Sequence, residues 1–306
     1  MRALRGFQMA ALAAALWAGV AFAGGPEAGD IAADAKAYVH FDTALIRKSA
    51  VLKAFRADMG ATNPLDKTLE TLATFTGFHL LDDMEGVTFY TTTLKEGEGV
   101  LLIYGQVSPD EVLPHVEAFP HHATQAYGEH KIHTWFDEQR NAVVAGIVSE
   151  KLIMWADGID RLKAALDVRD GKKEGKYALA RNYPKGALFG AGVSDVPAFA
   201  TKPDQQVFAL AKSFELSLSE DKGSVTAVLT AGMADAEQAG QVQQIAEGLK
   251  AFMALNKAKM PEVAKLVAQV KTEVEGVQAR VRLERPAATA FGDIKTIQAA
   301  TAGKAK

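Results

Sequence analysis

The stretch from Met84 to Phe119 most constrains the fold of this chain, because it predicts a strand, a tight turn, a second strand and a helix in direct succession. Val87 to Thr93 is a run of β-branched and aromatic residues, which favours a half-buried strand. Gly97 and Gly99 suit a chain reversal, and the apolar run from Val100 to Tyr104 predicts a strand covered on both faces. We therefore expect these two strands to pair as a hairpin.

The same order of elements recurs about a hundred residues later. Apolar and polar residues alternate from Phe214 to Leu218, a turn follows at 221–223, and a return strand is predicted from Val225 to Leu229. A second helix follows, and its expected buried face consists of Val242, Ile245, Leu249 and Phe252. The sequence thus predicts an α+β fold with duplicated antiparallel or mixed sheets and with helices packed on one face.

The start of the chain has the pattern of a signal peptide. Arg2 and Arg5 precede an apolar run from Met9 to Val20. Ala21 and Ala23 then provide small side chains at the two positions that a signal peptidase reads. The run is shorter than the roughly 20 apolar residues of a spanning helix, which weakens the alternative of a membrane anchor. We expect a bacterial protein exported to the periplasm or the exterior, with no membrane span after cleavage.

The remaining chain divides at its most polar, glycine-rich stretch. Polar residues from Arg169 to Gly186 predict a linker, because few core-forming side chains occur there. The expected organisation is a signal peptide at 1–23, a first α+β domain at 24–168, a linker at 169–186, a second α+β domain at 187–299 and a disordered tail at 300–306.

Composition excludes several classes of function. The chain has no cysteine, so disulfides, a lipid-bearing thiol and a thiol nucleophile are all excluded. Loss of the two arginines of the signal peptide takes the formal charge from −3 to −5. This acidic balance offers no electrostatic basis for binding nucleic acid.

Histidine density is the strongest chemical signal in the sequence. His115, His121, His122, His130 and His133 lie close together, and imidazole is a common ligand of zinc and other divalent metals. We take His121, His122 and His130 as the candidate metal ligands, provided that the loop after residue 120 folds them together. Strand alternation places His130 and His133 on opposite faces, and no helical His-Glu-x-x-His pattern occurs. Ordinary loop and strand-face histidines are the alternative interpretation.

Carboxylates offer a second chemical candidate. Asp82 and Asp83, Glu85, and Asp157 with Asp160 would serve a hydrolase only if burial separated their pKa values. Turn formation and helix capping explain these positions more simply. No nucleophile elbow, P-loop or dinucleotide fingerprint is present, so no catalytic or cofactor-binding residue is predicted.

The strand start at Gly86-Val87-Thr88-Phe89 and the helix start at Ser108-Pro109-Asp110-Glu111 follow an export signal. In this order of elements the chain resembles secreted bacterial proteins that are grouped as domains of unknown function. The resemblance implies an exported α+β protein. It brings no established activity and no functional residue.

The sequence therefore predicts an exported, soluble binding or interaction protein, with an unknown protein or a small ligand as its partner. The expected binding place is the surface of the sheets or the cleft between the halves. Two alternatives remain: a metal-binding or metal-dependent protein that uses the segment from His115 to His133, and a hydrolase with an unrecognised carboxylate site.

Overall fold

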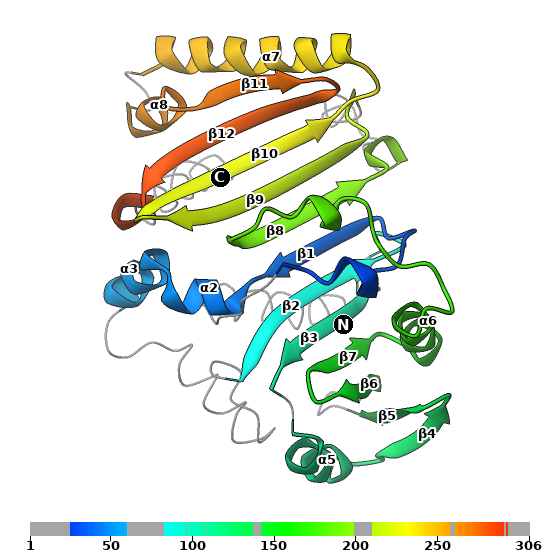
Figure 1. The fold of residues 1–306 in the computed structure, drawn as a ribbon. Helices are drawn as coiled ribbons and strands as arrows, with labels where there is room; N and C mark the ends of the chain where they lie inside the picture. Colours follow the sequence, from blue (N-terminus) through cyan, green and yellow to red (C-terminus); the bar gives the residue numbers. More distant parts are fainter. Residues whose placement is uncertain are drawn as a thin grey trace, which may run out of the picture.

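The structure is a computed structural model that describes residues 25–59, 83–95, 97–106, 108–136, 142–198, 210–257, 261–290 and 292. Its centre is one sheet, in which the twelve strands of these residues follow the order β11-β12-β10-β9-β8-β1-β2-β3-β7-β6-β5-β4 (Figure 1). All neighbouring strands pair antiparallel. The strands are β1 Ala37–Phe41, β2 Met84–Thr91, β3 Val100–Gly105, β4 Ala123–Tyr127, β5 His130–Phe136, β6 Ala142–Ser149, β7 Leu152–Ala156, β8 Ala187–Ser194, β9 Ser213–Asp221, β10 Ser224–Gly232, β11 Lys271–Glu275 and β12 Gln278–Pro286.

Helices connect these strands, and the predicted α+β class is confirmed. The hairpin of β2 and β3 forms as predicted, with Gly97 in its turn at a φ of 79°, a conformation that favours glycine. Helix α5 begins directly after Ser108, also as predicted. The helices are α2 Thr43–Lys48, α3 Ala50–Met59, α5 Pro109–Glu117, α6 Ile159–Arg169, α7 Ala236–Leu255 and α8 Pro261–Val267, with short 3-10 turns η1 Ala28–Asp30, η2 Ala180–Asn182 and η3 Val196–Ala198.

Two apolar clusters lie on opposite faces of the first half of the sheet. Leu102 and Met154 are cross-strand neighbours on β3 and β7, and both are fully buried in a cluster that includes Leu166 of α6. Ile103, the next residue along β3, points the other way and packs in a cluster with Val112 of α5. The helices of this half therefore cover both faces of the sheet.

The two halves meet where β1 pairs with β8 (Figure 1). Outward from this junction the strands run β1-β2-β3-β7-β6-β5-β4 on one side and β8-β9-β10-β12-β11 on the other. The order of the first five strands on each side matches, and β5 and β4 have no counterpart. The segment predicted as a linker packs closely, because Tyr177 and Ala180 belong to the buried cluster of the first half. The carboxylate of Glu220 on β9 accepts hydrogen bonds from the backbone N–H groups of Ala50 and Val51, which caps α3.

The predicted buried face of α7 is confirmed at Val242 and is wrong at its other three residues. Its apolar contacts with the sheet include Ala239 and Val242, which pack near Ala231 and Ala279 of β10 and β12. Ile245, Leu249 and Phe252 were expected to face inward, yet their exposed fractions are 50%, 59% and 59%, and that of Leu255 is 85%. The helix lies along the outer strands of the sheet, so only one side of it is covered (Figure 1).

Candidate functional site

The structure does not bring the three candidate metal ligands together. His122 Nε2 lies 3.0 Å from His133 Nδ1, and the two rings are stacked. His130 Nε2 lies 2.8 Å from the Asp170 carboxylate, at the end of α6. Within the described ranges, no group of three His, Cys, Asp or Glu residues is placed to hold a metal ion.

A turn at His121 explains why it separates from its neighbour. His121 has a φ of 60°, the left-handed region that a residue with a side chain seldom adopts. Its ring therefore faces Phe136, while the ring of His122 reaches His133. The His122–His133 pair is the close contact that sequence reasoning missed, and the histidine density of the segment was its only signal.

Burial sets the protonation of this pair. His133 is 3% exposed, and its pKa is lowered from 6.5, first by burial and then by the neighbouring charge of His122, against a weaker opposing effect of Glu117. One imidazole donates and the other accepts in the bond between them, which requires at least one neutral ring. The pair is thus suited to neutral pH and opposes the binding of a second proton.

Acidification is expected to destabilise the fold through His133. The unfolded chain binds a proton near pH 6.5 while the folded chain still resists it, so the free energy of unfolding falls as the pH drops below about 6.5. Urea unfolding from about pH 8 to pH 5 should show a smaller fall for His133→Gln than for the natural chain. The exposed His115→Gln serves as the control, and an equal pH dependence in all three proteins would contradict this role.

A groove with a volume of about 670 Å³ lies beside α6. Arg161 lines it and is held by two carboxylates: its Nη2 lies 3.0 Å from Glu98, and its Nε lies 2.5 Å from Asp157. That Nε–H is not directed at the Asp157 oxygen, so the contact is an ion pair and the buried Nε–H has no acceptor among the described residues. Tyr90 also lines the groove, and burial raises the pKa of its phenol far above neutrality.

The charges of this groove are mixed. Arg161 and Lys173 contribute cations, and Asp34 and Glu174 contribute anions. Tyr90 is a neutral phenol at physiological pH, as a tyrosine is at its ordinary pKa, and burial raises that pKa further. The groove therefore offers hydrogen bonds to a small polar molecule without a preference for one sign of charge.

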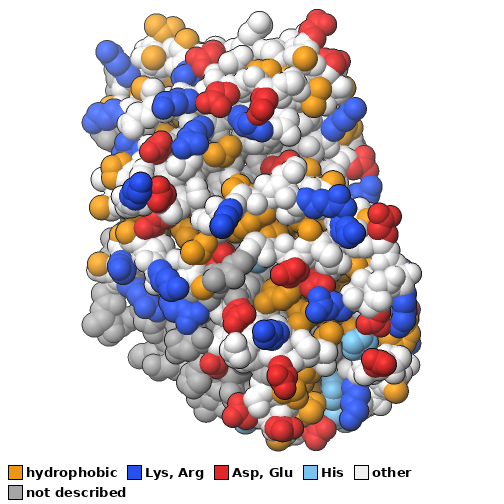
Figure 2. Space-filling model, in the orientation of Figure 1, with side chains coloured by type: hydrophobic (Ala, Val, Ile, Leu, Met, Phe, Trp, Pro, Cys, Tyr) orange, Lys and Arg blue, Asp and Glu red, His pale blue; other side chains and the backbone are white. Residues whose placement is uncertain are grey.

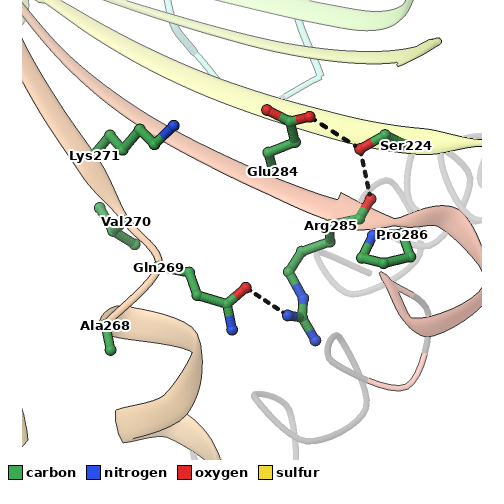
Figure 3. Close-up of a pocket in the computed structure, with 8 residues that line it drawn as sticks. All are labelled: Ser224, Ala268, Gln269, Val270, Lys271, Glu284, Arg285 and Pro286. Atoms are coloured by element: carbon green, nitrogen blue, oxygen red, sulfur yellow. Dashed lines mark hydrogen bonds between the residues drawn. The ribbon is translucent and has the colours of Figure 1, made fainter. Parts of the chain in front are cut away.

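A second hollow, of about 490 Å³, lies beside the start of β11 and the end of β12 (Figure 3). Ser224 donates to the Glu284 carboxylate at 3.3 Å, and Arg285 donates to the Gln269 side chain at 2.6 Å. These polar groups bond to one another across the hollow. They are thus directed at one another and do not converge on a shared point within it.

The candidate carboxylates do not form one site. Glu85 accepts a hydrogen bond from Gln106 at the start of β2, whereas Asp157 pairs with Arg161 at the start of α6. Asp82 lies outside the described residues. Glu85 and Asp157 thus contact different side chains at separate places in the fold.

Four large apolar side chains of α7 are exposed on the side away from the sheet. We call the residues Ile245, Leu249, Phe252 and Leu255 the α7 stripe; each is at least half exposed. Figure 2 shows hydrophobic side chains at the surface over α7, together with charged ones, and it shows further hydrophobic areas in the middle and lower parts of the view. Leu216 and Leu229, cross-strand neighbours on β9 and β10, are each 41% exposed as well.

Such exposure is unusual for a chain that packs alone. Single exposed apolar residues are common, but contiguous groups of large ones mark interaction surfaces. No helix in the described part of the chain is long and apolar enough to cross a membrane. The α7 stripe is therefore the strongest candidate for a contact surface, and the groove beside α6 is a second, polar one.

Comparison with known proteins places the fold. No family model and no curated protein matches the chain. Among solved structures, crystal form III of TP0453 is similar over 88% of this chain and 97% of that chain, at 12% identity and a TM-score of 0.50. Crystal forms IV and I align at 11% and 12% identity over 89% and 90% of this chain and 97% and 98% of those chains, with TM-scores of 0.48 and 0.43. At such low identity the chain is similar to TP0453 in fold alone.

Proposed function

We propose that this protein is an exported interaction protein and that its partner packs against the α7 stripe. The observation that carries this proposal is the exposure of four large apolar side chains on one side of one helix. Phe252 is the central aromatic residue of the stripe, and aromatic side chains often dominate the binding energy of an interface.

The energetic reason is the hydrophobic effect. Each large apolar side chain that moves from water into a packed contact contributes about 0.8 to 1.5 kcal/mol when half of its surface is already covered. Four such residues supply a useful gain before the costs of association are subtracted. The same proposal includes export to the periplasm or the exterior, which the N-terminal pattern supports. It also includes descent of the two halves from a duplicated unit, which the strand order supports.

Photo-crosslinking tests the proposed function. We would replace Phe252 with the photoreactive residue benzoylphenylalanine and irradiate the protein in cells of its source. The expected result is a discrete covalent adduct, because the probe would lie within the contact.

The matched control carries the same residue at position 254. Ala254 is also exposed and lies about 200° around the same helix from Phe252, which places it outside the stripe. An adduct at 252 and none at 254 supports the proposal. Absence of any discrete adduct at 252 would refute it.

A metal-binding alternative has one observation behind it, the 3.0 Å contact between His122 and His133. Two imidazoles are fewer ligands than a structural zinc site uses, and their nitrogens are directed at each other. Thermal unfolding with zinc and with chelator separates the two functions. A zinc-dependent rise in Tm that disappears in His122→Ala would favour the metal-binding function.

A further inference from the structure

We infer that the partner on the α7 stripe is a second copy of this chain, paired helix to helix about a two-fold axis. This inference rests on the proposed function, because it names the occupant of the same surface. Ile245, Leu249 and Phe252 are spaced by four and three residues, the spacing found along the seam between two packed helices. Leu255 continues the apolar surface to the end of the helix.

The position of α7 permits this contact. The helix packs against β11, β12 and α8, and it lies at the end of the sheet opposite to β4 (Figure 1). No other element of the described residues lies beyond it in that direction. Two copies can therefore approach along α7 without a collision between their sheets.

The charge distribution of α7 suits a contact with itself. In a two-fold interface, residues near the axis face their own copies, so a charged stripe would repel. The exposed neighbours of the stripe include Gln241 and Gln244, which are uncharged. Glu247 and Lys250 lie 3.0 Å apart and neutralise each other on the flank of the helix. The stripe is therefore complementary to its own copy.

The available area is that of a small specific dimer. Such an interface needs roughly 1,000 Å² in total. Each exposed side chain of the stripe offers on the order of 100 Å², so two copies supply most of this area from eight side chains. The flanking glutamine and alanine side chains supply the remainder.

A glycine within the stripe is an independent observation. Gly248 lies between Ile245 and Leu249 in the helix interior, where glycine is unfavourable, and a Cβ built there meets no atom within 4 Å. The fold of the single chain thus gives no reason for a glycine at this position. A helix of a second copy would give such a reason, because a residue without a side chain lets the two helix backbones approach closely.

Sedimentation equilibrium of residues 24–306, from about 1 to 100 μM, tests the inference. The expected result is a dimer for the natural sequence and a monomer for the variant Leu249→Asp/Phe252→Asp, with at least about a 100-fold loss of affinity. Ala254→Asp puts the same charge on the same helix outside the stripe, and this control should remain a dimer. Far-UV circular dichroism and Tm check that each variant is folded. We expect the variants to fold, because the substituted side chains are exposed in the single chain.

Glycine substitutions give a second, independent measurement. Gly248→Ala should raise Tm of the monomer through better helix propensity and should weaken the dimer by about 10-fold or more. Gly240→Ala, about 80° around the helix, should leave the dimer unchanged because Gly240 lies outside the stripe. A dimer strengthened by Gly248→Ala would count against close packing of the two helices.

Other outcomes would overturn the inference in distinct ways. A natural chain that stays monomeric at about 100 μM, or a dimer that survives Leu249→Asp/Phe252→Asp, excludes pairing through α7. If the natural chain is a monomer but position 252 crosslinks to another protein, the proposed function is supported and pairing of two copies is excluded. If it binds vesicles of phosphatidylethanolamine and phosphatidylglycerol through the same residues, the stripe serves a lipid surface and both proposals fail.

Discussion

Replacement of Leu102 with alanine is expected to lower the free energy of unfolding by about 3 kcal/mol. Leu102 is fully buried on β3, opposite Met154 of β7 and in the cluster that contains Leu166 of α6. Truncation removes three carbon atoms from a closely packed layer that is covered by a helix, so a cavity remains. Urea unfolding followed by circular dichroism measures the change.

Leu216→Ala is the matched control on the same sheet. Leu216 lies on β9 and is 41% exposed, so truncation removes less buried surface and leaves no closed cavity. We expect a cost below about 1 kcal/mol. Equal costs for the two substitutions would contradict the expectation that burial of Leu102 sets its contribution to the free energy of unfolding.

Replacement of Arg169 with methionine is expected to cost about 2 kcal/mol, the second largest effect. Asp30 is 2% exposed and accepts hydrogen bonds from Arg169 Nη1 at 2.8 Å and from Tyr104 Oη at 3.2 Å. Methionine keeps the apolar part of the side chain but removes the cation. The buried Asp30 carboxylate then retains only one of its two donors, the neutral Tyr104 hydroxyl. Because the Arg169 side chain is 43% exposed, water replaces part of the lost interaction, and the expected cost stays below that of a fully buried pair.

Two further variants show whether burial causes this effect. Lys36→Met breaks the pair of Lys36 with Asp195, which has the similar length of 3.0 Å but is exposed on both sides, and should cost less than about 0.5 kcal/mol. Asp30→Asn combined with Arg169→Met removes the buried charge as well and should regain part of the loss. If Arg169→Met costs no more than Lys36→Met, Asp30 does not depend on its cation.

Local composition was sufficient to predict the hairpins of β2 with β3 and of β9 with β10. The β-branched run in β2 and the apolar run in β3 determine their own conformation, and the glycine between them permits the reversal. The sequence did not reveal that both halves join one sheet. That junction depends on pairing between β1 and β8, which are about 150 residues apart, and no local pattern encodes such a register.

Contacts between distant residues also decide how the histidines from His115 to His133 are arranged. The sequence identified a dense group of imidazoles, but the pairs depend on distant contacts. His133 meets His122 because β4 pairs with β5, whereas His130 meets Asp170, which is 40 residues away on another element. Strand alternation predicted that His130 and His133 would separate, and the structure confirms it.

Helix α7 separates most clearly what the sequence determined from what the tertiary structure decided. Spacings of three and four residues determined a helix with apolar residues from Val242 to Leu255. Apolar residues occur on two adjoining sides of this helix, so periodicity alone cannot select the buried one. Docking against β11 and β12 covered the side of Ala239 and Val242 and left the side of Phe252 in solvent. Only the tertiary structure decided this, because burial depends on which surface a neighbouring element occupies.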